Sequence, residues 1–218
     1  MQKSVIEHFT EKFQRGYYET KEVRALPIAL SKGKLLEVGC GARFTYSCQK
    51  LERYAIDIQD DFVKLLKARH PIANALIADV KSLPFQKASF NIIVANVLLH
   101  HLVSKTANLC EENMNDAIKA MQDILEPNGY ILIREKLPRN YLLCLAIFYA
   151  TLVCAKLKLE IPLLEIRSKV VTFFPTEQQL KNFCSRNGFH IKKLHSTEWK
   201  LRGLIKIGEL VEWLLIHK

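Results

Sequence analysis

A glutamate and two glycines lie close enough together in the sequence to form part of a ligand site. Glu37 precedes Gly39 and Gly41 at the end of a short apolar run. Glycines let the backbone turn sharply and approach a ligand without a Cβ in the way. A dinucleotide site requires a third glycine where this chain has Phe44, so close approach to a pyrophosphate is not provided for. Glu37 would repel a phosphate but suits a ligand that carries an ammonium group; the alternative is an ordinary glycine turn after a strand.

Two further carboxylates end short apolar runs. Asp57 lies 18 residues beyond Gly39, near the distance at which an acid at a second strand tip accepts hydrogen bonds from ribose hydroxyls. Asp79 ends the next run and could receive an amine, such as the exocyclic amino group of adenine. Either acid alone could be a strand-end turn residue. Their occurrence at consecutive strand tips favours a ligand site.

An amide and two histidines follow the fourth apolar run. Asn96 ends that run, and His100 and His101 come four and five residues later. Histidine titrates near neutrality, so either ring could act as a general base. A structural role for the pair is the alternative.

Five short apolar runs must position these residues, and helical patterns separate them. The predicted strands are 35–38, 54–56, 75–78, 90–95 and 130–134, and the predicted helices between them include 44–51, 60–70 and 111–125. This alternation predicts an α/β fold with a mostly parallel sheet and helices on both faces, and with the ligand at the carboxyl ends of the strands. The helix at 44–51 is expected to point its N-terminal amides into the same crevice.

The rest of the chain is predicted to complete a single domain over residues 1–218. Residues 1–30 are predicted to be helical, including a run from Lys21 to Leu30, and 31–136 form the ligand-binding half. Residues 137–174 form an apolar insertion and 175–218 the closing elements: a helix capped by Thr176, then strands at 189–195 and 211–217. The stretch 199–209 receives no assignment.

The insertion contains fifteen residues without a charge, from Tyr141 to Ala155. This is shorter than the roughly 20 residues that a membrane-spanning helix needs. The run is expected to cover a pocket for an apolar substrate or to contact a membrane surface. A buried helix packed on the sheet is the alternative.

Composition and cysteine usage limit the classes of protein to which this chain can belong. The chain has 49% hydrophobic and 25% charged residues, as globular proteins do. Its six cysteines are scattered without a C-x-x-C pair, which favours a reducing compartment and argues against a zinc site. We expect a cytoplasmic protein without a signal peptide or bound metal.

The positive charge is concentrated in the C-terminal third. Residues 136–206 carry 13 Lys and Arg against 4 Asp and Glu, a balance of +9 out of the total of +10. Such a region can attract nucleic acid, anionic lipid headgroups or an acidic small substrate. A solvated basic surface without a partner is the alternative.

Five motifs in order resemble the class I S-adenosylmethionine-dependent methyltransferases over about residues 30–136. The motifs are Glu37-Val38-Gly39-Cys40-Gly41, Asp57, Asp79-Val80 with Leu83-Pro84-Phe85, Asn96 to Leu102, and Leu125 to Tyr130. The resemblance implies a Rossmann-like sheet of seven strands with an antiparallel last strand. It also implies S-adenosyl-L-methionine as the cofactor.

The resemblance assigns roles to individual residues. Gly39 and Gly41 would line the methionine portion and Glu37 would hold its ammonium, while Asp57 would bind the ribose. The backbone around Asn96 would face the sulfonium, and His100 or His101 would act as the base. The remaining residues expected in the cofactor site are Cys40, Ile58, Asp79 and Val80, the last two at the adenine.

Three functions are compatible with these motifs. The first is methyl transfer to a small or lipid-like acceptor, and the second is methylation of RNA such as tRNA, suggested by the basic C-terminal third. The third is a non-catalytic S-adenosylmethionine-binding protein, suggested by Arg43 at a position where the family often has glycine. The sequence assigns no oligomeric state.

Overall fold

The computed structural model describes residues 24–27, 30, 32–47, 50–162, 166 and 170–217. They contain a seven-stranded sheet in the order β5-β4-β2-β6-β7-β9-β8. Adjacent strands from β5 to β7 pair in parallel, whereas β9 is antiparallel to both β7 and β8. This arrangement confirms the predicted mostly parallel, Rossmann-like sheet with an antiparallel last strand. The strands are β2 Lys34–Val38, β4 Glu52–Asp57, β5 Asn74–Ile77, β6 Phe90–Asn96, β7 Leu125–Pro138, β8 Phe189–Leu201 and β9 Ile205–His217.

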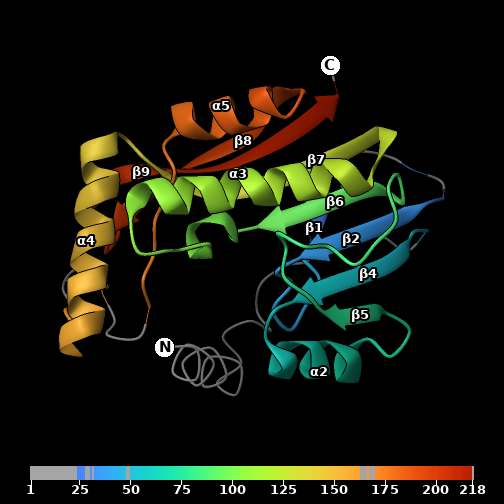
Figure 1. Ribbon diagram of the computed structural model, residues 1–218, viewed down its shortest axis with the longest axis horizontal. Helices are drawn as coiled ribbons and strands as arrows, with labels where there is room; N and C mark the ends of the chain where they lie inside the picture. Colours follow the sequence, from blue (N-terminus) through green and yellow to red (C-terminus); the bar gives the residue numbers. More distant parts are fainter. Residues whose placement is uncertain are drawn as a thin grey trace.

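Helices cover both faces of this sheet because the central strands are apolar on both sides. Along β6, Ile93 belongs to the main core, while Ile92 and Val94 belong to a second cluster on the opposite face. Figure 1 shows α3 crossing the sheet, with α5 beside it and α2 at the β5 end. The helices are α2 Asp60–Arg69, η1 Leu99–His101, α3 Ala107–Ile124, α4 Tyr141–Leu157 and α5 Glu177–Arg186.

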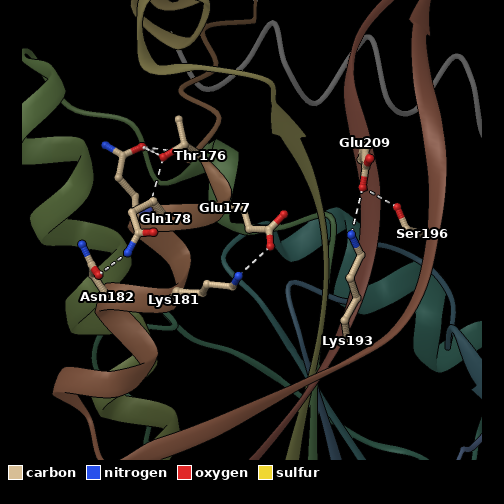
Figure 2. Close-up of polar contacts among 9 residues, drawn as sticks. Thr176, Glu177, Gln178, Lys181, Asn182, Lys193, Ser196 and Glu209 are labelled. Carbon is tan, nitrogen blue, oxygen red and sulfur yellow. Dashed lines mark hydrogen bonds and ion pairs between the residues drawn. The ribbon is translucent and has the colours of Figure 1, made fainter.

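Local capping sets the limits of two of these helices. The Thr176 side chain accepts a hydrogen bond from the Gln179 amide, and the Gln179 side chain accepts one from the Thr176 amide, forming the capping box that starts α5 (Figure 2). Gly188 follows the end of α5 with φ +70°. The N-cap of α3 is Thr106, so this helix starts four residues before the predicted Glu111.

Two predicted helices are wrong where the structure describes them. Tyr46–Ser47 form strand β3 instead of part of a helix over 44–51, and they pair in parallel with β1, Arg24–Ala25. The Thr45 amide is bonded to Glu37 and the Tyr46 hydroxyl to Glu212, and both contacts favour an extended chain over a helix. The helix predicted over 21–30 is wrong at Arg24 and Ala25, which form β1. Pro27 also disfavours helical backbone in Leu26, the residue before it.

The prediction for residues 1–23 lies outside the described residues. The division of the chain into a cofactor-binding half, an insertion and closing elements stays a prediction.

The unassigned stretch 199–209 extends the closing hairpin. Strands β8 and β9 pair from Phe189↔His217 to Leu201↔Ile205. Arg202 and Gly203, both with positive φ, turn the chain between them. Both strands are therefore longer than their apolar segments predicted, because the charged tip of the hairpin continues the same backbone ladder.

Candidate cofactor site

A cavity of about 580 Å³ lies at the carboxyl ends of β2, β4, β5 and β6, whose arrowheads point to the same side in Figure 1. We call residues 37–45, 56–62 and 78–81 its carboxylate wall, and residues 96–103 and 170–171 its histidine wall. All nine residues predicted to bind the cofactor line the cavity: Glu37, Gly39, Cys40, Gly41, Asp57, Ile58, Asp79, Val80 and Asn96. His101 lines it as well, whereas His100 is not among the lining residues.

Glu37 is engaged by its own loop. Its carboxylate accepts hydrogen bonds from the Thr45 amide, at 2.9 Å to Oε2, and from the Thr45 hydroxyl. The side chain is buried, and this burial raises its pKa to about 7 against the lowering effect of Thr45 and Arg43. Sequence reasoning missed Thr45, and no motif marks it. The geometry makes Glu37 a residue that shapes the glycine loop and also lines the cavity.

Asp57 joins the glycine loop to the tip of β4. Its Oδ2 accepts the Gly41 amide and its Oδ1 the Gln59 amide, both at 2.9 Å. Burial raises the pKa of the carboxyl, partly offset by these amide donors. Gly41 has φ +57°, and a Cβ there would meet no atom within 4 Å. The loop is therefore held open beside the cavity by a buried carboxylate.

Asp79 caps the turn after β5 in a similar local way. Its Oδ1 accepts the Lys81 amide at 2.9 Å, and its backbone oxygen accepts the Ser82 amide. The side chain is half-buried, and the neighbouring Val80 is buried at 5% exposure. Among the described residues, the second carboxylate oxygen of Asp79 accepts no hydrogen bond, and the residue lines the cavity.

The tip of β6 has two features that the sequence did not reveal. Val97 has φ +54°, which is rare for a β-branched residue, and its amide donates to the Arg134 carbonyl at 2.6 Å. The buried Oδ1 of Asn96 has no hydrogen-bond partner among the described residues. Strained backbone and unsatisfied buried polar atoms are typical of ligand sites.

The two histidines have different environments. His100 is buried, its Nδ1 lies 2.8 Å from Glu135 Oε1, and its ring stacks on Phe174 at a centroid distance of 4.5 Å. Burial lowers the pKa of His101 well below its usual value, and the nearby His100 and Lys136 lower it further. His101 is therefore a neutral ring on the cavity. Glu135, fully buried on β7, was missed because it lies in the charged run Arg134-Glu135-Lys136, which resembles a solvated strand end.

The donor and acceptor set of the cavity fits S-adenosylmethionine. Asp57 and Asp79 offer carboxylate oxygens at two strand tips, the Asn96 oxygen is unsatisfied, and Gly41 leaves space that a Cβ would fill. These groups match a ligand with hydroxyls, an amine and an ammonium group. Within the described residues, no three His, Cys, Asp or Glu side chains gather in a way that could hold a metal ion.

Comparisons with known proteins agree with this geometry. Residues 36–133 match a family model described as a methyltransferase domain. No curated protein matches the chain at a significant level. Many solved structures share the fold, and each of the three described next is similar to this chain at low sequence identity.

A SAM-dependent methyltransferase from Methanosarcina mazei is 18% identical, with a TM-score of 0.66 over 89% of this chain and 99% of that one. A possible histamine N-methyltransferase from Thermotoga maritima is 17% identical, with a TM-score of 0.63 over 98% of both chains. The geranyl diphosphate C-methyltransferase of Streptomyces coelicolor is 10% identical, with a TM-score of 0.58 over 100% of this chain and 84% of that one.

The family match runs from the middle of β2 through most of β7 and includes every residue of the carboxylate wall. The order of the motifs along the chain, the strand order of the sheet and the family match agree with one another. They identify residues 36–133 as a methyltransferase domain with the fold of the S-adenosylmethionine-dependent methyltransferases.

Proposed function

We propose that this protein transfers a methyl group from S-adenosylmethionine to a small or lipid-like acceptor. The observation that carries the proposal is that all nine predicted cofactor residues line one cavity together with His101. Asp57 would bind the ribose, Asp79 and Val80 the adenine, and the glycine loop the methionine portion. Glu37 would act on the ammonium mainly through the loop that it holds, since both of its oxygens already accept hydrogen bonds from Thr45.

The cofactor, when bound, supplies a methyl group that is already activated on a sulfonium. The chain must therefore align the acceptor and, for a hydroxyl or an acidic carbon, remove a proton. His101 is the candidate base because it lines the cavity and its lowered pKa keeps the ring neutral and able to accept a proton. His100 is a positioning residue: Glu135 and Phe174 fix its ring 4.0 Å from the ring of His101.

The composition of the histidine wall supports this acceptor class. Apart from Asn96 and His101, the residues that line it are apolar: Val97, Leu98, Leu102, Val103, Val170 and Val171. An apolar wall favours an acceptor with an apolar body over a nucleobase, which requires polar groups that read its edge. One similar structure is named for methylation of geranyl diphosphate, a molecule with a hydrocarbon chain.

Methyl-labelled S-adenosylmethionine and a fractionated cell extract provide the test. We expect label in the lipid or small-molecule fraction and no more than background in RNA and protein. The variant His101→Gln should lose most of this label while retaining cofactor affinity by calorimetry, and His190→Gln, at an exposed residue of β8, should retain both.

The competing functions give different outcomes in this experiment. Label in RNA would replace the proposed acceptor class. Stoichiometric cofactor binding without labelled product in any fraction would support the non-catalytic alternative. Affinity for NAD equal to that for S-adenosylmethionine would contradict the cofactor assignment itself.

A further inference from the structure

Helix α4 exposes an apolar stripe. Leu142 is 78% exposed, Tyr149 49%, Val153 50% and Leu157 62%, and the exposed Ala146 lies between them in the sequence. At 3.6 residues per turn, these five residues fall within an arc of roughly 80° on one side of the helix. The stripe runs along nearly the whole of Tyr141–Leu157. An apolar face of this length on a surface helix indicates an interaction site.

The opposite face of α4 is firmly attached, so the stripe is not the result of a loosely packed helix. The Cys144 thiol donates to the Phe174 carbonyl at 2.7 Å, and the Thr172 amide donates to the Thr151 hydroxyl at 3.3 Å. Phe148 packs edge-on against Phe173 with ring centroids 5.5 Å apart. These contacts fix the rotation of the helix and direct the stripe outward.

Basic side chains stand at both ends of the stripe. Lys156 and Lys158 lie at its C-terminal end and Arg139 just before its N-terminal end, and all three are exposed. None of the three makes an ion pair with any residue that the structure describes. By contrast, Lys181 pairs with Glu177 and Lys193 with Glu209 (Figure 2).

The acidic groups near α4 leave this charge unbalanced. Glu111 accepts the Tyr141 hydroxyl at 3.1 Å, and Glu160 follows the helix. Residues 136–206 as a whole keep 13 basic against 4 acidic side chains. Cations at both ends of an apolar face are complementary to a layer that is negatively charged outside and apolar inside.

We propose that α4 docks through this stripe onto the surface of an anionic phospholipid bilayer. No helix among the described residues is long and apolar enough to span a membrane. A helix with a fixed apolar face and flanking lysines instead lies in the interface plane, with its cations at the headgroups. A second copy of the chain would pair the stripes but would also bring the like charges at their ends together.

Docking at α4 brings the cavity close to the lipid. The segment that packs beneath α4 continues from Val170 and Val171, which line the cavity, and the Phe173 amide donates to the His100 carbonyl at 3.1 Å. Figure 1 shows α4 on the side of the molecule to which the strands β2, β4 and β6 point. If the proposed function holds, the acceptor is an amphiphile taken from the bilayer.

Vesicle flotation tests the docking without any methyl transfer. The full chain is mixed with vesicles of pure phosphatidylcholine or of phosphatidylcholine with phosphatidylserine. We expect at least tenfold more bound protein on the anionic vesicles, decreasing as salt screens the charges. Equal binding to both vesicle types, or none to either, would overturn the proposal.

Two variants and a matched control separate the apolar and basic contributions. The triple change Leu142→Ser, Tyr149→Ser and Val153→Ser should lower vesicle binding at least tenfold, and Lys156→Gln with Lys158→Gln should lower it about fivefold for each lysine removed. The control replaces three exposed apolar residues in or just before the edge strand β5, Ile72, Leu76 and Ile77, by serine. It should bind vesicles within twofold of the wild type.

Two further measurements distinguish this proposal from the others. Light scattering with chromatography reports the oligomeric state, and a dimer that the triple variant dissociates, without vesicle binding, would assign the stripe to a second copy. Cofactor affinity, measured in the same preparations, should stay unchanged in the triple variant. Vesicle binding without methyl transfer would leave the docking intact and remove the proposed function.

Discussion

The two walls of the cavity are held in different ways. On the carboxylate wall, the three strand-end acids are bonded to backbone amides of the strand-tip loops: Glu37 to Thr45, Asp57 to Gly41 and Gln59, and Asp79 to Lys81. On the histidine wall, the contacts join distant elements: His100 to Glu135 on β7, and Phe173 to the His100 carbonyl. The carboxylate wall is therefore shaped by short loops and the histidine wall by the packing of the whole sheet.

The largest expected effect is the pH dependence of stability caused by Glu37, and it tests how completely the carboxylate wall is buried. The pKa of Glu37 lies near 7 in the folded chain against an ordinary value of 4.5. The stabilisation that protonated Glu37 gives to the folded state is thus fully present below pH 4.5 and is lost as the pH rises through 7. From pH 4.5 to 7.5, the unfolding free energy of the wild type should decrease by about 3 kcal/mol relative to Glu37→Gln.

Urea unfolding of both proteins without cofactor at pH 4.5 and pH 7.5 measures this difference. Parallel pH profiles of the wild type and the variant would show that Glu37 is solvated, and the carboxylate wall would then not be preorganised by its loop.

The next effect concerns ligand affinity. Asp57→Ala leaves the Gly41 and Gln59 amides without their acceptor and removes the proposed ribose partner. Hydrogen bonds to a charged group contribute about 1.5–3 kcal/mol each, so we expect S-adenosylmethionine to bind about 100-fold more weakly. Calorimetry with Asp57→Asn as an intermediate and the exposed Asp123→Ala as a control checks this. Affinity within threefold of the wild type would remove Asp57 from the site.

A smaller effect would distinguish the two walls. Glu135→Gln leaves one acceptor oxygen for the three donors that the carboxylate now serves, the His100 amide, the His100 ring and the Lys136 amide. We expect turnover to decrease about tenfold, about 1.4 kcal/mol, while cofactor affinity stays within twofold. A steady-state assay with the labelled acceptor, combined with calorimetry, measures both. A parallel loss of affinity would mean that the walls are not independent.

The smallest effect is expected where the walls touch. A Cβ on Gly39 would lie 2.4 Å from Leu98 Cδ1, whereas one on Gly41 would meet nothing within 4 Å, and both glycines have positive φ. The two alanine variants share the backbone strain, so Gly39→Ala should be less stable than Gly41→Ala by about 1 kcal/mol. Thermal unfolding measures this difference. Making both glycine changes in a Leu98→Ala background should reduce the difference between them, and a difference that persists there would point to the backbone rather than to Leu98.

The same difference between the walls explains what the sequence could predict. The acids and glycines at strand ends are local signals, and the structure places every one of them on the cavity. Glu135 and Phe174 could not be found this way, because their contacts with His100 depend on how β7 and the 170–174 segment pack in the folded sheet.

The errors in the helices have the same origin. The stretch 44–51 was predicted to be helical from its own residues, but Glu37 and Glu212 bind Thr45 and Tyr46 in an extended chain. The residue type of Val97 predicts the wrong backbone conformation, since a β-branched residue is expected to have negative φ and Val97 has positive φ.

The strand order also has a consequence for how the chain folds during synthesis. Strand β8 leaves the ribosome before β9, yet β9 lies between it and β7. The carboxylate wall can assemble once β6 has been made, whereas β8 must wait for the following strand before it can join the sheet. Trp199 on β8 contacts Phe174, which stacks on His100. A ribosome-bound chain stalled before residue 205 should therefore have a formed glycine loop and an unfinished histidine wall.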